Sequence, residues 1–256
     1  MIPDVLHIGP IPIHIFGICL ALAFLASGAV ASRELGRKGY DPEIGSTMLV
    51  WAAVGGVVGA RVWLVFEDWH GFVQDPIGFL FTGSGFVFYG GLLGGALAVT
   101  IVFRRHAIPW WRGADAVAPA LLIGHAIGRL GCQLAGDGDW GTVTTVPWGM
   151  AYPHAVVGWP YPPGVVVHPT PVYEMVAYLA IFAFLWRKRL QPAPDGALFG
   201  WYLVLASIAR FVVEFWRVND VIAFGLTSAQ LTALVLIALG ALRLGTLERR
   251  WRPAAA

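Results

Sequence analysis

The stretch Ile127–Gly141, IGRLGCQLAGDGDWG, marks the place where a long apolar segment passes into a polar loop. An arginine, a cysteine and two aspartates follow directly on a run of aliphatic residues. A charge at membrane depth costs about 2.5–3.5 kcal/mol. If the segment crosses a membrane, its arginine needs a reason to be there.

The composition predicts an integral membrane protein. Of the 256 residues, 57% are hydrophobic and 12% charged, and the mean hydropathy is +0.69. A soluble domain has about 25% charged residues. The net charge of +2 gives no basis for binding nucleic acid, and no such partner is expected. Two cysteines, Cys19 and Cys132, do not make a disulfide framework.

Seven stretches approach the roughly 20 apolar residues that a transmembrane helix needs. They are 12–32, 46–66, 86–103, 115–135, 170–186, 197–216 and 226–244. The predicted fold is therefore an all-α integral membrane protein with seven transmembrane helices in a single domain over 1–256. Residues 136–169, rich in Gly, Pro and aromatic side chains, are predicted to form a small extracytoplasmic head within it.

Basic residues predict the orientation, because cytoplasmic loops carry an excess of Lys and Arg. Thirteen of the seventeen follow the first, third, fifth and seventh segments: Arg33, Arg37, Lys38, Arg104, Arg105, Arg112, Arg187, Lys188, Arg189, Arg243, Arg249, Arg250 and Arg252. The N-terminus is thus expected outside and the C-terminus in the cytoplasm.

The other four arginines, Arg61, Arg129, Arg210 and Arg217, lie within apolar segments or at their outer ends. In ARFVVEFWR, Glu214 shares one helix face with Arg210 and Arg217. Such a face is either a self-contained ion-pair ladder or an anion site with net positive charge, since planar guanidiniums match phosphate oxygens.

Polar residues at the outer ends of other segments are further candidates. His168 opens HPTPVYEM and either bonds the backbone or joins a site. Glu174 lies deeper and needs a partner. Tyr89 stands beside Gly90 and Gly91, where it faces either the interface or the interior.

Glycines at four-residue spacing predict close helix packing. The pairs Gly55/Gly59, Gly90/Gly94 and Gly124/Gly128 are expected to bring the second, third and fourth segments together. GDGDWG matches a dinucleotide fingerprint only in its letters, because that fingerprint needs a preceding strand and a following helix.

Taken together, these motifs resemble the prolipoprotein diacylglyceryl transferase family. IGPIPIHIFGICLAL resembles the family's first helix, GARVWLVF its second-helix arginine motif and FYGGLLGG its third-helix His-Gly-Gly motif. GRLGCQLAGDGDWG resembles the fourth-helix signature, and HPTPVYE and RFVVEFWR match the last two motifs.

The resemblance implies transfer of diacylglycerol from phosphatidylglycerol to a lipobox cysteine thiol of a prolipoprotein signal peptide, with release of glycerol phosphate. It implies a multi-pass protein of the bacterial cytoplasmic (inner) membrane, in contact with membrane lipids and without metal or organic cofactor. The alternatives are a relative with a different acceptor, or a lipid or solute transporter. Transporters often contain internal repeats, and GARVW, GRLGC and EFWR do not recur at a fixed period.

The resemblance also implies residue roles. Arg129 and Arg210 would bind phosphate and stabilise the leaving group, while Glu214 and Asp137 would orient arginines or bind glycerol hydroxyls. The predicted catalytic set is Arg129, Arg210, Tyr89, Asp137 and Glu214; the predicted substrate-binding set is Arg61, Gly90, Gly91, Cys132, Gly138, His168, Glu174 and Arg217.

This chain departs from the family pattern at several positions. Tyr89 stands where the family has histidine, and Cys132 and Ala135 stand where it has asparagines. Asp137 is the best match to a glutamate, and Phe16 replaces a tyrosine. Either Tyr89 acts differently, or the base lies elsewhere, or the reaction differs. Cys132 is a small apolar side chain or a nucleophile whose pKa the neighbouring arginine lowers.

Overall fold

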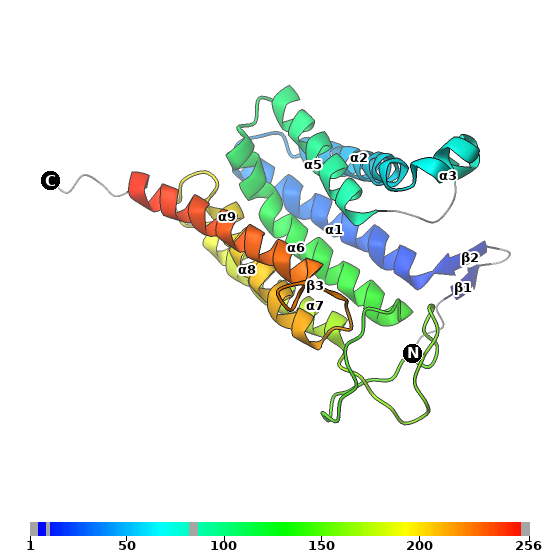
Figure 1. The fold of residues 1–256 in the computed structure, drawn as a ribbon. Helices are drawn as coiled ribbons and strands as arrows, with labels where there is room; N and C mark the ends of the chain where they lie inside the picture. Colours follow the sequence, from blue (N-terminus) through cyan, green and yellow to red (C-terminus); the bar gives the residue numbers. More distant parts are fainter. Residues whose placement is uncertain (1–4, 9–10, 82–86, 252–256) are drawn as a thin grey trace. The chain divides into compact units, whose positions relative to one another are not determined.

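Long α-helices dominate the computed structural model, which describes residues 5–8, 11–81 and 87–251 (Figure 1). One helix lies at each of the seven predicted segments: α1 (Ile15–Arg37), α2 (Glu43–Glu67), α5 (Phe88–Arg105), α6 (Trp110–Ala135), α7 (Thr170–Lys188), α8 (Ala197–Val213) and α9 (Ser228–Trp251). Five stretches of the described chain are long and apolar enough to cross a membrane: Ile15–Arg37, Glu43–Glu67, Trp110–Ala135, Ala197–Trp216 and Ser228–Arg249. The chain is a mostly helical, multi-pass membrane protein.

Short elements join these helices. β1 (Val5–Ile8) pairs antiparallel with β2 (Ile11–His14), and a second hairpin joins β3 (Val221–Ala223) to β4 (Leu226–Thr227). The first helix therefore begins at Ile15, later than the predicted start at residue 12, because residues 11–14 pair as a strand.

Between α2 and α5 lie α3 (Trp69–Gln74) and α4 (Pro76–Phe81), which the apolar pattern did not predict. Their caps have a clear sequence signal. The Asp68 carboxylate accepts a hydrogen bond from the Gly71 amide, and Asp75 does the same for Gly78, both at 2.9 Å. Aspartate is among the preferred N-cap residues.

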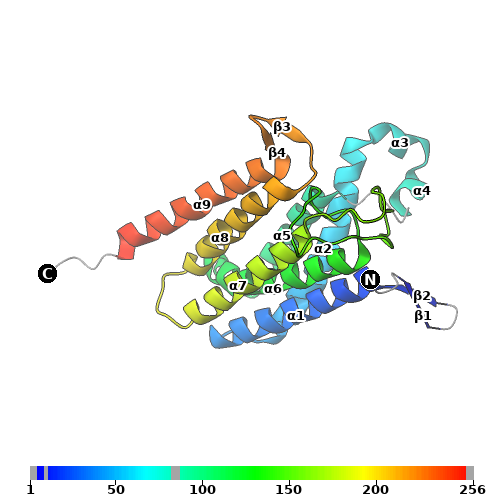
Figure 2. The ribbon, with the colours of Figure 1, turned by 90° about the horizontal axis from the view of Figure 1, so that it is seen from below.

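The chain divides into two compact units, one of residues 1–30 and 114–256 and one of residues 31–113. In the first unit α6, α7, α8 and α9 lie side by side (Figure 2). A core shared by α6, α7 and α8 contains Ala118, Leu122, Ala126, Tyr178, Leu185, Leu198 and Ala206. Buried Asp115 of α6 accepts hydrogen bonds from the Gly196 and Phe199 amides at 2.7 and 2.8 Å, which caps the start of α8.

Residues 136–169 form an irregular loop in the first unit. Isolated bridges pair Val143 and Met150 with Val167. Buried Val167 packs with an aromatic cluster that includes Trp140 and Tyr152. Burial raises the pKa of Tyr152 to about 12, and its hydroxyl donates a hydrogen bond to the side chain of Gln133 at 2.9 Å.

In the second unit, glycines let α2 and α5 approach closely. A Cβ at Gly55 would lie 2.6 Å from the carbonyl oxygen of Gly94, and one at Gly59 would lie 2.8 Å from the Cα of Gly94. The predicted glycine packing of the second and third segments is confirmed. In the fourth segment, Gly124 faces Ser27 of α1, whose hydroxyl donates to the Ala120 carbonyl at 2.9 Å, and the predicted contact of this segment with the other two stays a prediction. A Cβ at Gly128 would meet open space.

We expect Gly59→Ala to destabilise the protein by about 1–3 kcal/mol, because its methyl group would collide with the α5 backbone. Gly56→Ala is the matched control in the same helix, since its nearest neighbour, the Gly91 carbonyl, would be 3.6 Å away. Thermal unfolding in detergent measures both variants. Equal midpoints for the two would contradict the close approach at Gly59.

Candidate active site

Three arginines and three carboxylates of the first unit form a closed ring of ion pairs. Its members, the charged ring, are Arg129 of α6, Asp139 of the following loop, Glu174 of α7, Arg210 of α8, Glu214 of the 3₁₀ turn Glu214–Trp216, and Arg217. The members alternate in charge around the ring, so each side chain lies between two of opposite sign.

Specific atoms close the ring. Arg129 pairs with Asp139 and with Glu174, and Arg217 pairs with Asp139. Arg210 Nη1 lies 2.8 Å from Glu174 Oε1 and 2.7 Å from Glu214 Oε2. Arg217 Nε lies 3.5 Å from the same Glu214 oxygen, and this contact closes the ring.

Burial divides the ring into a hidden part and an accessible part. The side chains of Glu174 and Glu214 are 0% exposed, and that of Arg217 is 8% exposed. Arg129 and Arg210 keep 23% and 22% of their side-chain surface. Asp139 keeps 27% of its side-chain surface. Arg129, Arg210 and Asp139 are therefore partly exposed, while Glu174 and Glu214, which pair with the two arginines, are not.

The charge balance bears on one prediction. The sequence allowed either a self-contained ion-pair ladder or an anion site with net positive charge at Arg210, Glu214 and Arg217. In the structure Glu174 and Asp139 extend the pairing to other segments, and the ring of three arginines and three carboxylates is formally neutral. The physical reason is the cost of an unpaired charge in an apolar environment, which is several kcal/mol per ion. The partner that Glu174 was predicted to need is supplied twice, by Arg129 and Arg210.

The loop after α6 reaches the ring through a close backbone approach. Gly141 N donates to the His168 carbonyl at 2.8 Å, and Thr142 N donates to the Trp216 carbonyl at 2.7 Å. A Cβ at Gly141 would lie 2.9 Å from His168 Cβ and from Thr170 Cγ2. The last glycine of GDGDWG is thus needed for the loop to lie between the start of α7 and the end of α8.

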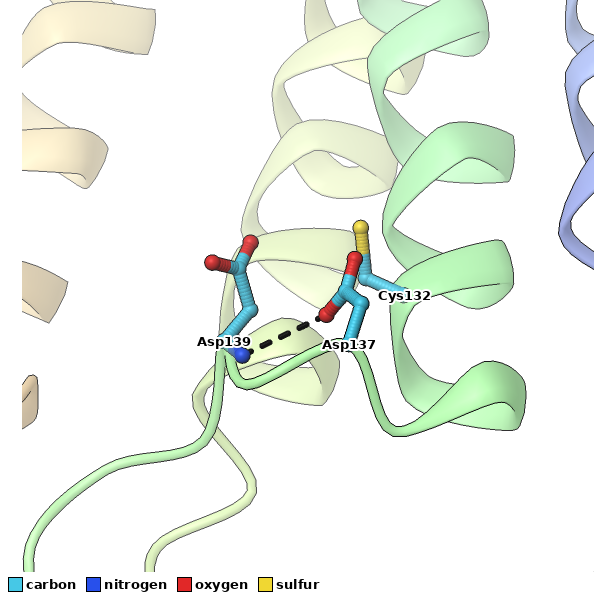
Figure 3. A group of neighbouring side chains, drawn as sticks. All are labelled: Cys132, Asp137 and Asp139. Carbon is cyan, nitrogen blue, oxygen red and sulfur yellow. Dashed lines mark hydrogen bonds between the residues drawn. The ribbon is translucent and has the colours of Figure 1, made fainter. Parts of the chain in front are cut away.

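Asp139 has the arginine contacts that the sequence analysis expected of Asp137. Asp139, rather than Asp137, pairs with Arg129 and Arg217, while Asp137 lies beside Cys132 (Figure 3). Asp137 Oδ1 accepts a hydrogen bond from the Asp139 amide at 3.3 Å. Positive φ angles at Gly136 and Gly138, 66° and 93°, turn the loop between these aspartates. Sequence spacing alone could not show which one faces the ring.

Cys132, Asp137 and Asp139 place one ligand atom each within 4.8 Å of one another. This chemistry does not suit a cation, because Asp139 is already bound by two guanidiniums. Cys132 Sγ also lies 4.0 Å from Arg129 Nη1. The thiol is a neighbour of the charged ring, and the positive charge beside it opposes a second cation.

His168 takes part in a polar and aromatic cluster one turn before Glu174. Its Nδ1 shares a 3.0 Å hydrogen bond with the Tyr173 hydroxyl, to which Trp148 Nε1 donates at 2.7 Å. The ring of Trp216 lies 6.1 Å from those of His168 and Tyr173. His168 therefore bonds a side chain, which neither sequence interpretation specified.

The remaining predicted residues belong to the second unit. Arg61 lies in α2, and Tyr89, Gly90 and Gly91 open α5. Gly90 faces Trp63 and Ala60 of α2, so its small size serves helix packing. The charged ring is closed by residues of the first unit alone.

Two residues outside the charged ring bind one of its members, and the sequence analysis predicted neither contact. Thr227 Oγ1 and Asn219 Nδ2 donate to Glu214 Oε1 at 2.8 and 2.7 Å. The pattern Thr-x-x-Gln at 227–230 is a capping-box signature and could have marked Thr227 as a helix start. Its bond to Glu214 has no signature, because the two residues are thirteen positions apart.

Asp139 lies outside the helices, and its ionisation depends on the ring. Burial alone would raise the pKa of Asp139, but the hydrogen bond and charge of Arg217 and the charge of Arg129 outweigh it and hold the pKa below its ordinary value. The folded state thus favours the carboxylate. This stabilisation is present above the ordinary aspartate pKa of about 3.9 and is lost as the pH falls below it.

We expect Asp139→Asn to lower the free energy of unfolding at neutral pH by about 1–3 kcal/mol, because partly buried Asp139 loses its charge-assisted bonds to two arginines, and the unfolding temperature should fall by several degrees. The gap to the original protein should close as the pH falls through about 3.9 and below. Thermal unfolding across this pH range measures it. Asp137→Asn is the control, with no arginine ion pair to lose. A pH-independent gap for Asp139→Asn would contradict the ring.

Comparison with known proteins agrees with the sequence resemblance. A family model described as prolipoprotein diacylglyceryl transferase matches residues 3–245. A phosphatidylglycerol–prolipoprotein diacylglyceryl transferase of Nostoc sp. is 32% identical over 98% of this chain and 91% of its own length. Enzymes of the same name from Leptospira interrogans and Acinetobacter baumannii are 35% and 31% identical, over 81% and 93% of this chain and 72% and 89% of theirs. The chain belongs to the prolipoprotein diacylglyceryl transferase family.

Proposed function

We propose that this protein transfers the diacylglyceryl group of phosphatidylglycerol to the lipobox cysteine thiol of a prolipoprotein. The sulfur attacks the glyceryl carbon that carries the phosphate oxygen. A carbon–sulfur bond forms, the carbon–oxygen bond breaks, and its electron pair leaves on glycerol phosphate. The thiol proton passes to a base, since the thiolate is the nucleophile.

The single observation that carries the proposal is the pair of accessible arginines held in the charged ring. The phosphate diester has one negative charge, and the leaving glycerol phosphate gains a second as the bond breaks. Donors that are already fixed in place stabilise such developing charge without reorganising. Arg129 and Arg210 take this role because both are partly exposed and both pair with the buried carboxylate of Glu174, while Arg210 also pairs with buried Glu214.

Other residues support these two. Glu174, Glu214 and Arg217 position the arginines through the ring. Asp137 and Gly138, on the loop after α6, would meet the glycerol hydroxyls. Cys132 and His168 border the same region and contribute to its walls.

The proposed topology has all seven long helices crossing the cytoplasmic membrane of a bacterium. The N-terminus and residues 136–169 lie outside and the C-terminus inside, as the distribution of basic residues favours. The charged ring then lies at the outer surface, where phosphatidylglycerol and the signal peptide of a prolipoprotein meet. Arg61, Tyr89, Gly90 and Gly91 are proposed to take part in transfer because the family resemblance implies it.

We expect Arg129→Ala and Arg210→Ala each to lower transfer by about 100-fold or more, as removal of one donor to a developing oxyanion does. The assay uses purified protein, phosphatidylglycerol and a lipobox peptide, with the thioether product measured. Arg105→Ala, an exposed arginine at the end of α5, is the matched control. Full activity of either arginine variant would contradict the proposed role of that arginine in binding phosphate. A folded protein that makes no thioether would remove the proposed acceptor.

Substitution of Tyr89 tests whether its hydroxyl or another group accepts the thiol proton. If its hydroxyl takes the place of the family histidine, Tyr89→Phe should lower kcat by about 100-fold, as loss of a general base does, and Tyr89→His should retain transfer. The same thioether assay measures both variants. Unchanged transfer by Tyr89→Phe would show that the base lies elsewhere.

A further inference from the structure

Glu214 differs from the other carboxylates of the charged ring in how its two oxygens are used. Each oxygen of Glu174 and of Asp139 pairs with an arginine. In Glu214, by contrast, Oε2 forms ion pairs with both Arg210 and Arg217, and Oε1 accepts hydrogen bonds from Thr227 and Asn219. The Glu214 carboxylate is thus held on its Oε1 side by two neutral donors.

Thr227 is itself held in a single orientation. Its amide donates to Gln230 Oε1 at 3.1 Å, and its Oγ1 accepts from the Gln230 amide at 3.3 Å. A threonine hydroxyl has one hydrogen to donate. Because the Gln230 amide occupies the acceptor side of Oγ1, that hydrogen points to Glu214 Oε1, 2.8 Å away. Thr227 and Gln230 are both buried, so water does not compete for these bonds.

The consequence for the ring follows from the geometry of a carboxylate. With Oε1 held by Thr227 and Asn219, rotation of the group is blocked and Oε2 stays between Arg210 and Arg217. Because both donors are neutral, they fix Glu214 without changing the charge of the ring. A cationic donor at the same place would fix it equally well but would disturb the balance that the buried site requires.

We propose that Thr227, assisted by Asn219, is a positioning residue of the transferase: through Glu214 it holds Arg210 in the orientation that meets the phosphate. This inference rests on the proposed function. Thr227 lies behind the carboxylate and does not reach the substrate itself, so its effect should depend on Glu214.

Thr227→Val tests the proposal, since it removes the hydroxyl and keeps the shape. We expect kcat for thioether formation to fall about 10–100-fold, which corresponds to losing one hydrogen bond to a charged group. KM for phosphatidylglycerol should change little, because the lost alignment acts in the transition state. Thr227→Ser should keep most of the activity. Thr246→Val, a threonine at the other end of α9 that bonds the Arg243 carbonyl, is the control.

A double-mutant cycle separates positioning from mere stability. In a Glu214→Gln background, Thr227→Val should cost much less than it does alone, because the carboxylate through which it acts is gone. Thermal unfolding identifies variants that fail to fold. Wild-type kcat in folded Thr227→Val, or an equal loss in both backgrounds, would overturn the positioning role.

Binding of glycerol phosphate gives a readout that does not need turnover. Weaker binding by Thr227→Val than by Thr246→Val, measured by calorimetry, supports the positioning of Arg210. If the original protein binds glycerol phosphate in this Thr227-dependent way but makes no thioether, the transfer proposal fails and the positioning of the anion site stands. If Thr227→Val binds as tightly as the original protein, the positioning fails.

Discussion

The cost of placing charge in an apolar environment governs the arrangement of this molecule. Three arginines at the ends of apolar helices each need a counter-charge, and each buried carboxylate needs a cation. The charged ring satisfies all six at once by alternating their signs. Because its members come from α6, α7, α8 and the segments after α6 and α8, the same ion pairs fix the relative positions of these elements. Fold and site therefore depend on one set of interactions.

Neutrality has a consequence for the proposed reaction. Glycerol phosphate carries more negative charge than the phosphate diester from which it forms. A pocket with three uncompensated arginines would bind this product tightly, which would slow its release. Arginines whose charge is balanced by carboxylates bind the product less tightly, yet they stay fixed in place to stabilise the charge that develops in the transition state. Binding that is strongest in the transition state is what raises kcat.

The sequence predicted the parts of this structure that have a local cause. Hydropathy over about twenty residues located all seven long helices, and the cost of buried charge selected Arg129, Arg210 and Glu174. The glycines of α2 and α5 were identified by their spacing. These signals work because each is contained within one helix.

What the sequence could not predict depends on contacts between segments. Beyond Ala135 no helical period relates one residue to the next, so the choice of Asp139 over Asp137 rests on the turns at Gly136 and Gly138. The net positive charge that one interpretation allowed near Arg210 is cancelled by Glu174 from a different helix. Thr227 reaches Glu214 only because the β3–β4 hairpin folds back toward the end of α8.

The positions at which this chain departs from its family have a common feature: none of them is a member of the charged ring. Cys132 and Ala135 follow Arg129 on α6, with the thiol 4.0 Å from the guanidinium, and neither supplies an ion pair. Tyr89 lies in the other compact unit. The charged ring of this chain is thus complete although neighbouring positions depart from the family pattern. This is expected if phosphate recognition requires the whole ring, since losing one member would leave its two neighbours with one partner each and the ring with an unbalanced charge.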